Sequence, residues 1–523
     1  MSFVSREFRE AALAALPDLG AKPELFRLLV YLMFPRHLDR ISQNVVLDGD
    51  TLMRLDGKGD KVDAGKGRGD FKGARLLKRF KRCVMDGFAW SGWDSTKRLA
   101  RVATKTPWPR KLAGLISAEI SRGPSSRELV SVDAGRPCAQ IAADRRRERR
   151  ESHEFTCQAA CGLARRLLRY LNTRTARLFT IPPGNFDVAR RAIDEEAKVK
   201  TLTDTQVRYR IGVLRGIEAQ PQPFYQAAGA GRTVRVYGKD VGLLATSSSV
   251  RAALMPHWTE LDISSSQLRI NAADWHCPKL LELLRGGGSF WDQLIGSIPE
   301  LAEERSRRES AGDDPIKDAV KKAVYGVCYG MTKHDFSAIV RNTIGLNGVS
   351  TKLLANPYIS ELYDARAMRE KLIVEKGGFH DAFGRWIAME GGNVASVLAV
   401  VAQSVEMKVL GPVVELAGRS TGPHGFSITL WQHDGFSIVA HRPAMTMVWV
   451  DRLKKAVREY GKSLGYDIEL EVKQAGVNEG SADQGSWVAA TRRLRRSSRG
   501  QRTVPKPRRG KGLRARVYHG GGR

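Results

Sequence analysis

The chain has 523 residues, enough for about two to four domains, and 42% of them are hydrophobic, which is sufficient for sizeable cores. Lys and Arg number 86 against 56 Asp and Glu, and the net charge of +30 indicates a polyanionic partner, with nucleic acid favoured over an anionic membrane surface. No apolar run approaches the ~20 residues of a membrane span, no secretory signal is recognisable, and the six cysteines lack regular spacing, so we expect a cytoplasmic protein with reduced thiols.

The first 230 residues carry few motifs. Residues 1–150 are predicted to form a largely helical region of unknown role, in which Glu24–Phe34 has the pattern of a helix docked on a core. No Asp-x-Glu opens a predicted strand before residue 230, so no proofreading exonuclease is expected. Residues 151–230 are predicted to be helical, and the Pro-containing break at Gln220–Pro223 marks the entry to the next domain.

A first isolated aspartate stands where a predicted strand ends. His257–Asp262 alternates enough to be a strand, and three serines then turn into a helix expected to begin near Gln267. A carboxylate at the end of a buried strand is costly unless a cation compensates it, and Mg²⁺ prefers oxygen ligands. The alternative interpretation is an aspartate that caps the following helix.

The segment Lys317–Met331 is predicted to be a helix with cations and aromatic rings on one face. Four of its residues recur at intervals of four: Lys317, Lys321, Tyr325 and Tyr329. Two ammonium groups followed by two phenols suit a triphosphate at one end and a base pair at the other. Gly326 and Gly330 each cost about 1 kcal/mol in a helix, which indicates close approach of a ligand or neighbouring backbone. The alternative is an amphipathic helix whose lysines extend to solvent.

A second isolated aspartate is predicted at the tip of a hairpin. Ser427–Gln432 and Phe436–Ala440 have strand composition, and His433, Asp434 and Gly435 form a tight turn between them. An Asp before a Gly is common in hairpin turns for conformational reasons alone, and this is the alternative interpretation.

Taken together, the three segments resemble the motifs of the DNA polymerase I family (family A). The segment from Asp262 resembles motif A, D-Y-S-Q-I-E-L-R, with Gln267 in place of the family's Glu. Lys317–Met331 resembles the fingers helix, R-x-x-x-K-x-x-x-(F/Y)-x-x-x-Y-G, and the turn at Asp434 resembles motif C, Q-V-H-D-E, with Gly435 in place of Glu. The resemblance covers about residues 230–487, including the strand-like Ile468–Trp487 segment at the family's carboxyl end.

The resemblance implies a role for each matched residue. It implies that two Mg²⁺ ions, with Mn²⁺ as a substitute, are bound by Asp262, Asp434 and the backbone carbonyl of Ile263. It makes Lys321 a catalytic residue beside the two aspartates. The implied nucleotide-binding residues are Lys317, Lys321, Tyr325, Tyr329 and Gln267. The implied template or primer contacts are Gly330, His433, Arg232, Arg269 and Gln403.

The family further implies an α+β, right-hand polymerase fold with a palm of antiparallel sheet and helical fingers and thumb. On this interpretation residues 1–150 are an N-terminal region without an exonuclease motif, 151–230 a thumb-like region, and 231–487 the palm and fingers. Residues 488–523 are expected to be a disordered basic tail, because Arg492–Arg523 holds +13 of the +30 and no acid.

The function expected from these features is template-directed extension of a DNA primer with deoxynucleoside triphosphates, without proofreading. The expected partners are primer–template DNA, deoxynucleotides and a replication or repair protein bound through residues 1–150, with no membrane; the setting is cytoplasmic, nucleoid-associated or phage- or plasmid-encoded. In the family that Asp262–Arg269 resembles, the Glu at the position of Gln267 lies under the sugar and excludes a 2′-hydroxyl. Gln267 keeps the bulk of that Glu but loses its charge, and this change, with Gly435 after Asp434, leaves an RNA polymerase or primase-like enzyme as an alternative. A degenerate nucleic-acid-binding scaffold is a further alternative.

Overall fold

The computed structural model describes residues 3–35, 45–48, 99–102, 108, 110–121, 129–132, 140, 160–228, 233–238, 242–286, 289–308, 314–420 and 422–474. These residues form a mostly helical α+β structure with small antiparallel sheets, which agrees with the predicted α+β class. The predictions for Arg232 and for the basic tail lie outside the described residues, as does the part of the Ile468–Trp487 segment beyond residue 474.

The described residues before position 150 combine short helices with two pairs of strands. The elements are β1 (Phe3–Ser5), α1 (Arg6–Ala15), α2 (Pro17–Ala21), α3 (Pro23–Met33), β2 (Val45–Asp48), β3 (Leu99–Val102), α6 (Arg110–Ser121) and β4 (Leu129–Ser131). β1 pairs with β4 and β2 with β3, both antiparallel. The expected helix at Glu24–Phe34 is confirmed as α3, in which eight side chains, from Leu25 to Met33, are buried.

A four-stranded antiparallel sheet lies at the centre of the second half of the chain. Its strands, in spatial order, are β10 (Phe426–Gln432), β11 (Gly435–Ala440), β7 (Thr259–Ile263) and β12 (Leu470–Gln474). The predicted hairpin is confirmed, with His433 and Asp434 between β10 and β11. β7 is therefore a central strand with β11 on one side and β12 on the other, although β11 begins 172 positions and β12 207 positions after β7 ends (435 − 263 and 470 − 263).

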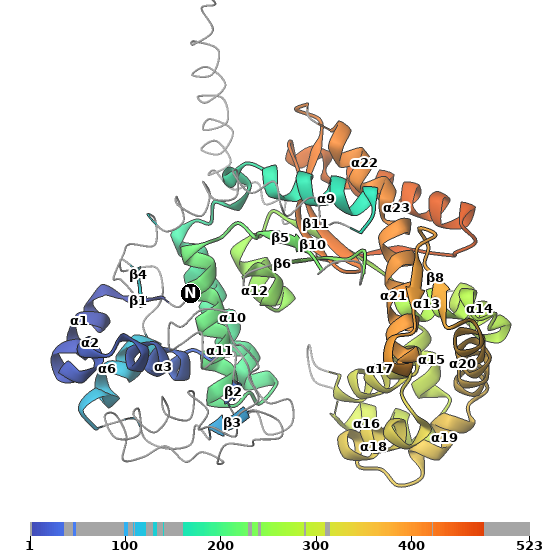
Figure 1. Cartoon of the computed structure of the whole chain (residues 1–523), viewed down its shortest axis with the longest axis horizontal. Helices are drawn as coiled ribbons and strands as arrows, with labels where there is room; N and C mark the ends of the chain where they lie inside the picture. The colour runs from blue at the N-terminus through green and yellow to red at the C-terminus, as the bar shows by residue number, and fades with distance from the viewer. Residues whose placement is uncertain are drawn as a thin grey trace, which may run out of the picture. The chain divides into compact units, whose positions relative to one another are not determined.

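Helices cover both faces of this sheet. The helices on one face are α9 (Gly162–Thr173), α21 (Val394–Val409), α22 (Gly411–Arg419) and α23 (Thr446–Ser463), and they share a core with Leu261, Ile263, Phe436 and Ile438. The helices on the other face are α10 (Pro183–Val199), α11 (Asp204–Ala219) and α12 (Ser248–Leu254), and they pack on Leu430 and Val439. Figure 1 shows α9, α22 and α23 beside the β10–β11 hairpin. The alternation of the strands thus divides their apolar residues between two cores.

A group of helices between β7 and α21 forms a third core. These elements are α13 (Ser266–Asp274), α14 (Pro278–Arg285), α15 (Phe290–Gly296), α16 (Pro299–Arg308), α17 (Pro315–Cys328), α18 (Lys333–Ile344), α19 (Val349–Ala355) and α20 (Pro357–Lys376), followed by the pair β8 (Gly378–His380) and β9 (Trp386–Ala388). One more strand pair, β5 (Tyr225–Ala227) with β6 (Val236–Gly238), precedes β7. Short 3₁₀ turns η2 (Ala176–Phe179), η3 (Leu243–Ala245), η4 (Glu390–Gly392) and η5 (Pro443–Met445) complete the described chain.

One helical stretch corrects the expectation that no apolar run reaches the length of a membrane span. Val394–Arg419, which comprises α21 and α22, is 26 residues long, contains an 18-residue window with a mean hydropathy of 1.6, and is by length and composition able to cross a bilayer. The structure buries 72% of its most apolar window inside the fold, and fully buried Glu406 lies within it. The stretch is apolar because it is a core helix pair, which hydropathy alone does not distinguish from a membrane helix.

Candidate active site

The register of the central sheet brings the two predicted aspartates together. Asp262 on β7 lies opposite Gly435 on β11, and the Ile263 amide donates a hydrogen bond of 3.0 Å to the carbonyl oxygen of Asp434. Asp262 is the next-to-last residue of its strand, and Asp434 occupies the hairpin turn beside it. Two carboxylates that are far apart in the sequence are therefore neighbours at one end of the sheet.

Burial and the charge of Asp434 disfavour ionisation of Asp262. Burial first, and then the neighbouring charge of Asp434, raise the pKa of Asp262 from 3.8 to about 7, while Lys473 on β12 acts in the opposite direction. Ser266 Oγ lies 3.0 Å from Asp434 Oδ2 and equally close to Glu406 Oε1, so its single proton is donated to one of these carboxylates at a time. Within the described residues, no Lys, Arg or His forms an ion pair within 4.0 Å with either carboxylate. The pair has the chemistry of an incomplete cation site.

α17 brings positive charge to the same region. It begins at Pro315, with the side chain of Asp314 accepting from the Lys317 amide as its N-cap. The Lys321 ammonium lies 5.7 Å from the ring centre of Trp291, and burial lowers the pKa of Lys321, with repulsion from Lys317 adding to the effect. Lys317 is already paired with Asp292 at 3.2 Å. Of the two predicted phosphate ligands, Lys321 is thus the one without a carboxylate partner in the described part of the chain.

The end of α17 differs from the predicted regular stripe. The helix ends at Cys328, so Tyr329 is its C-cap rather than a helical residue. Gly330 follows with φ of +86°, and a Cβ there would lie 2.8 Å from the Cβ of Ala395 on α21. Gly330 is required by a left-handed turn and by close helix packing. At Gly326 the close neighbour is the side chain of Met331.

A pocket of about 570 Å³ collects most of the predicted site. The predicted residues that line it are Asp262, Ile263, Gln267, Arg269, Lys317, Lys321, Tyr325, Tyr329 and Asp434. The edge of the Trp291 ring meets Tyr325, with 5.3 Å between ring centres. Carboxylates therefore face an ammonium group and aromatic rings across one cavity, which is an arrangement suited to a ligand with both phosphates and a planar ring.

Three predicted residues that the structure describes are not among those lining the pocket. His433 precedes Asp434 and packs edge-on against Tyr237, and burial, assisted by Arg235, lowers its pKa to about 4. Gly330 packs on α21. Gln403 lies on α21 and accepts a hydrogen bond of 3.0 Å from Thr233.

Several residues of the site were not predicted from the sequence. Glu406 on α21 is buried and accepts from Ser266 Oγ at 3.0 Å, from Gln267 Nε2 and from Arg235. Glu406 does not line the pocket itself, whereas Lys473 and Glu471 on β12 do. A lone acidic residue in the otherwise apolar run of α21 was the available signal for Glu406, because a charge is rarely buried without a partner.

The donor set fits a divalent cation in part. Two adjacent carboxylates and nearby backbone carbonyls are the hard oxygen ligands that Mg²⁺ prefers, and the raised pKa of Asp262 reflects an uncompensated negative charge. No group of three or more His, Cys, Asp or Glu side chains arranged to hold a metal occurs among the described residues. A bound cation would thus need oxygen ligands from a substrate or from water.

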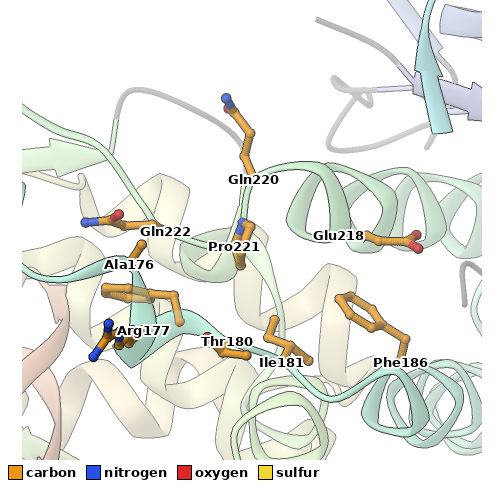
Figure 2. Close-up of a pocket in the computed structure, with 10 residues that line it drawn as sticks. Ala176, Arg177, Thr180, Ile181, Phe186, Glu218, Gln220, Pro221 and Gln222 are labelled. Atoms are coloured by element: carbon orange, nitrogen blue, oxygen red, sulfur yellow. The ribbon is translucent and has the colours of Figure 1, made fainter. Parts of the chain in front are cut away.

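A second pocket, of about 360 Å³, shares no lining residue with the first. Figure 2 shows Phe186, Ile181 and Pro221 on its walls and the Glu218 carboxyl group at one end. Burial raises the pKa of Glu218 to about 8, and within the described part of the chain its Oε2 is buried without a hydrogen-bond partner. Arg177 is the cation among the lining residues, but the pocket has one carboxyl group rather than a pair, so it offers fewer ligands for a cation than the first pocket.

No family model matches the chain, and no curated protein matches it. Among solved structures, the chain is similar to the POL domain of Pol1 from M. smegmatis in complex with DNA primer-template and dNTP, with 12% sequence identity and a TM-score of 0.39. The match covers 86% of this chain and 81% of that chain. At this identity and TM-score, the similarity supports no conclusion about the function of this chain.

Proposed function

We propose that this protein is a template-directed DNA polymerase of the family A type, which adds deoxynucleotides to the 3′-hydroxyl of a primer. The observation that carries the proposal is the meeting of Asp262, Asp434 and Lys321 at one pocket, from three segments that are distant in the sequence. Phosphoryl transfer needs charge stabilisation and positioning more than covalent chemistry, and acidic residues opposite a Lys meet that need.

In this proposal Asp262, Asp434 and the carbonyl of Ile263 hold two Mg²⁺ ions. When bound, these ions supply activation of the primer hydroxyl and stabilisation of the charge on the phosphates. The compensation they bring explains why two carboxylates with no cationic partner among the described residues lie side by side.

The side chains of α17 bind and orient the incoming nucleotide. Lys321 neutralises the charge that develops on the triphosphate. Lys317, which is paired with Asp292, adds a second positive charge near the phosphates. Tyr325, against Trp291, forms the apolar wall for the sugar and base. Tyr329 is partly exposed at the C-cap of the helix, where the template base pair would be checked.

Residues around the hairpin contact the primer and template in this proposal. His433, held neutral by its lowered pKa, hydrogen bonds to the primer end without adding charge. Arg269 donates to the carbonyl oxygens of Leu284 and Asp467. These two hydrogen bonds hold its guanidinium group in one orientation, in which it contacts the DNA. Gln403 and Arg232 are assigned to the same surface from the resemblance alone. Residues 1–150 are assigned no proofreading activity.

One observation favours the RNA polymerase or primase-like alternative, namely the neutral amide at Gln267. The experiment that separates the two is extension of a labelled DNA primer on a DNA template with Mg²⁺, comparing deoxynucleotides with ribonucleotides and using Asp262→Asn as the blank. We expect extension that depends on deoxynucleotides and is lost in the variant. Better use of ribonucleotides, or synthesis without a primer, would move the assignment to the alternative. Failure to extend with either nucleotide would leave the nucleic-acid-binding scaffold.

A further inference from the structure

Glu406 does not line the pocket, but its hydrogen bonds connect two residues that do, Gln267 and Asp434. It lies on α21, has no exposed surface, and pairs with Arg235. Its Oε1 also accepts from the Gln267 side-chain amide and lies 3.0 Å from Ser266 Oγ. Ser266 Oγ lies 3.0 Å from Asp434 Oδ2 as well, and its single proton is donated to one carboxylate at a time. Glu406 therefore contacts Gln267 directly and Asp434 through one hydroxyl group.

The bond to Glu406 fixes which way the Gln267 amide faces. Burial raises the pKa of Glu406, whereas Arg235 and the Gln267 amide act in the opposite direction and favour the carboxylate. A carboxylate only accepts hydrogen bonds, and the NH₂ of Gln267 faces it. The other end of the amide, Oε1, is buried and has no hydrogen-bond partner among the described residues. Among the described residues, Glu406 is thus the one side chain whose hydrogen bond fixes the amide group of Gln267. Gln267 lines the pocket and is only 5% exposed, so a small movement of its side chain changes the shape of the wall.

We propose that Glu406 is a positioning residue for sugar selection: by anchoring Gln267, it keeps the wall closed against a 2′-hydroxyl on the incoming nucleotide. This inference rests on the proposed function, because it takes the ligand of the pocket to be a nucleoside triphosphate. Gln267 lacks a charge of its own, and its bulk excludes a hydroxyl only while the side chain is held still. The carboxylate that holds it comes from a helix 139 residues further along the chain.

A purely structural role for Glu406 is the competing explanation, and the chain supplies a matched control. Glu119 on α6 is also buried, also pairs with an arginine, Arg215, and also accepts from a serine, Ser5. None of these three residues lines the pocket. Removing the charge of Glu119 breaks the same kind of network without touching Gln267. If Glu406→Gln changes sugar selection and Glu119→Gln does not, the change is therefore not a general effect of lost stability.

The test is calorimetric titration of dATP and ATP, with Mg²⁺ and without primer, into the full chain, Glu406→Gln and Glu119→Gln. We expect the unmodified protein to bind dATP more tightly than ATP. The ratio of the two dissociation constants should fall by about tenfold in Glu406→Gln, which is the effect of one lost charged hydrogen bond. Glu119→Gln should keep the ratio while lowering the melting temperature. An unchanged ratio in Glu406→Gln would overturn the proposal, as would an equal loss in both variants.

A swap of the two side chains provides a second measurement. Gln267→Glu alone places two carboxylates against each other, whereas Gln267→Glu combined with Glu406→Gln restores one acid and one amide. We expect the double variant to recover most of the dATP preference that each single variant loses, a coupling that independent sites do not show. Additive losses would overturn the proposal.

Primer extension by the unmodified protein separates this inference from the proposed function. Extension together with an unchanged dATP to ATP ratio in Glu406→Gln would refute the role of Glu406 alone. Nucleotide binding with the predicted ratios but without extension would refute the polymerase and support the role of Glu406. Absence of both nucleotide binding and extension would refute both.

Discussion

Gly435 and Asp262 face each other across β11 and β7 so closely that a Cβ at position 435 would lie 2.8 Å from Asp262 Oδ1. The same Cβ would lie 2.8 Å from the carbonyl oxygen of Leu261, which is backbone and moves at a higher cost. The residue that follows Asp434 is therefore glycine because the first aspartate occupies the space that a side chain would need. A side chain at position 435 would therefore displace Asp262 or the backbone of β7.

This relationship predicts the effect of a single added methyl group. Gly435→Ala should lower the free energy of unfolding by about 1–3 kcal/mol, the cost of overpacking at a fixed backbone, and should also reduce extension activity by displacing Asp262. Gly418→Ala on α22 is the matched control, because no atom lies within 4 Å of its Cβ and alanine favours a helix. Urea denaturation of both variants checks the prediction; equal stabilities would show that the sheet relaxes around the added group.

The pKa of Asp262 predicts a stability that depends on pH and Mg²⁺. Its value of about 7 in the folded protein lies above the ordinary 3.8, so the stabilisation by the neutral carboxyl group is complete below pH 3.8 and lost as the pH rises to 7. Asp262→Asn should therefore raise the melting temperature by about 2–4 °C at pH 8 with a chelator present, and have little effect at pH 4. Mg²⁺ should stabilise the unmodified protein at pH 8 and not the variant.

Thermal unfolding at the two pH values, with and without Mg²⁺, measures these effects. Asp451→Asn on α23 is the control, because Asp451 is exposed and outside the pocket. A variant at position 262 that is equally destabilised at both pH values would contradict the electrostatic explanation. Stabilisation of Asp262→Asn by Mg²⁺ would place the cation elsewhere.

Neighbouring lysines on α17 allow a sharp test of the nucleotide site. Lys321 lines the pocket, whereas Lys322 is exposed and does not. Lys321→Ala should lower kcat/KM for deoxynucleotides by about 100-fold or more, the usual effect of removing a group that stabilises charge in the transition state. Lys322→Ala, which removes the same charge from the same helix, should change it by less than about twofold. Similar losses in steady-state extension by both variants would indicate a general effect of charge.

Local elements around the pocket are predictable from the sequence, whereas the contacts between them are less so. The hairpin follows from two strand-like runs around a turn, and the existence of a helix here follows from the spacing of Lys317, Lys321 and Tyr325, although α17 begins earlier, at Pro315. The end of α17 does not follow from spacing, because the positive φ of Gly330 stops the helix one residue before Tyr329. Periodicity describes a continuous helix, and it carries no information on where packing ends one.

Glu406 illustrates the larger gap between sequence and site. Its partners Ser266 and Gln267 are 140 and 139 residues away, and they meet it only because α21 and α13 pack together. Hydropathy suggests that the helix is buried, but not which of its buried residues contacts the residues of the pocket wall. The aspartates were easier to find, since Asp262 lies near the end of a strand-like run and Asp434 lies in the turn of a recognisable hairpin.

The charge of residues 492–523 predicts how the protein binds DNA. This segment carries +13 of the net +30, and every phosphate that a basic group neutralises releases counterions. Its deletion should weaken binding to duplex DNA and reduce the slope of log K against log salt, by about 0.9 for each lost phosphate contact. Replacement by a neutral Gly/Ser segment of equal length is the control for length. Fluorescence anisotropy across a salt series measures both quantities, and an unchanged slope after deletion would assign the electrostatic contacts to the rest of the chain, which keeps +17.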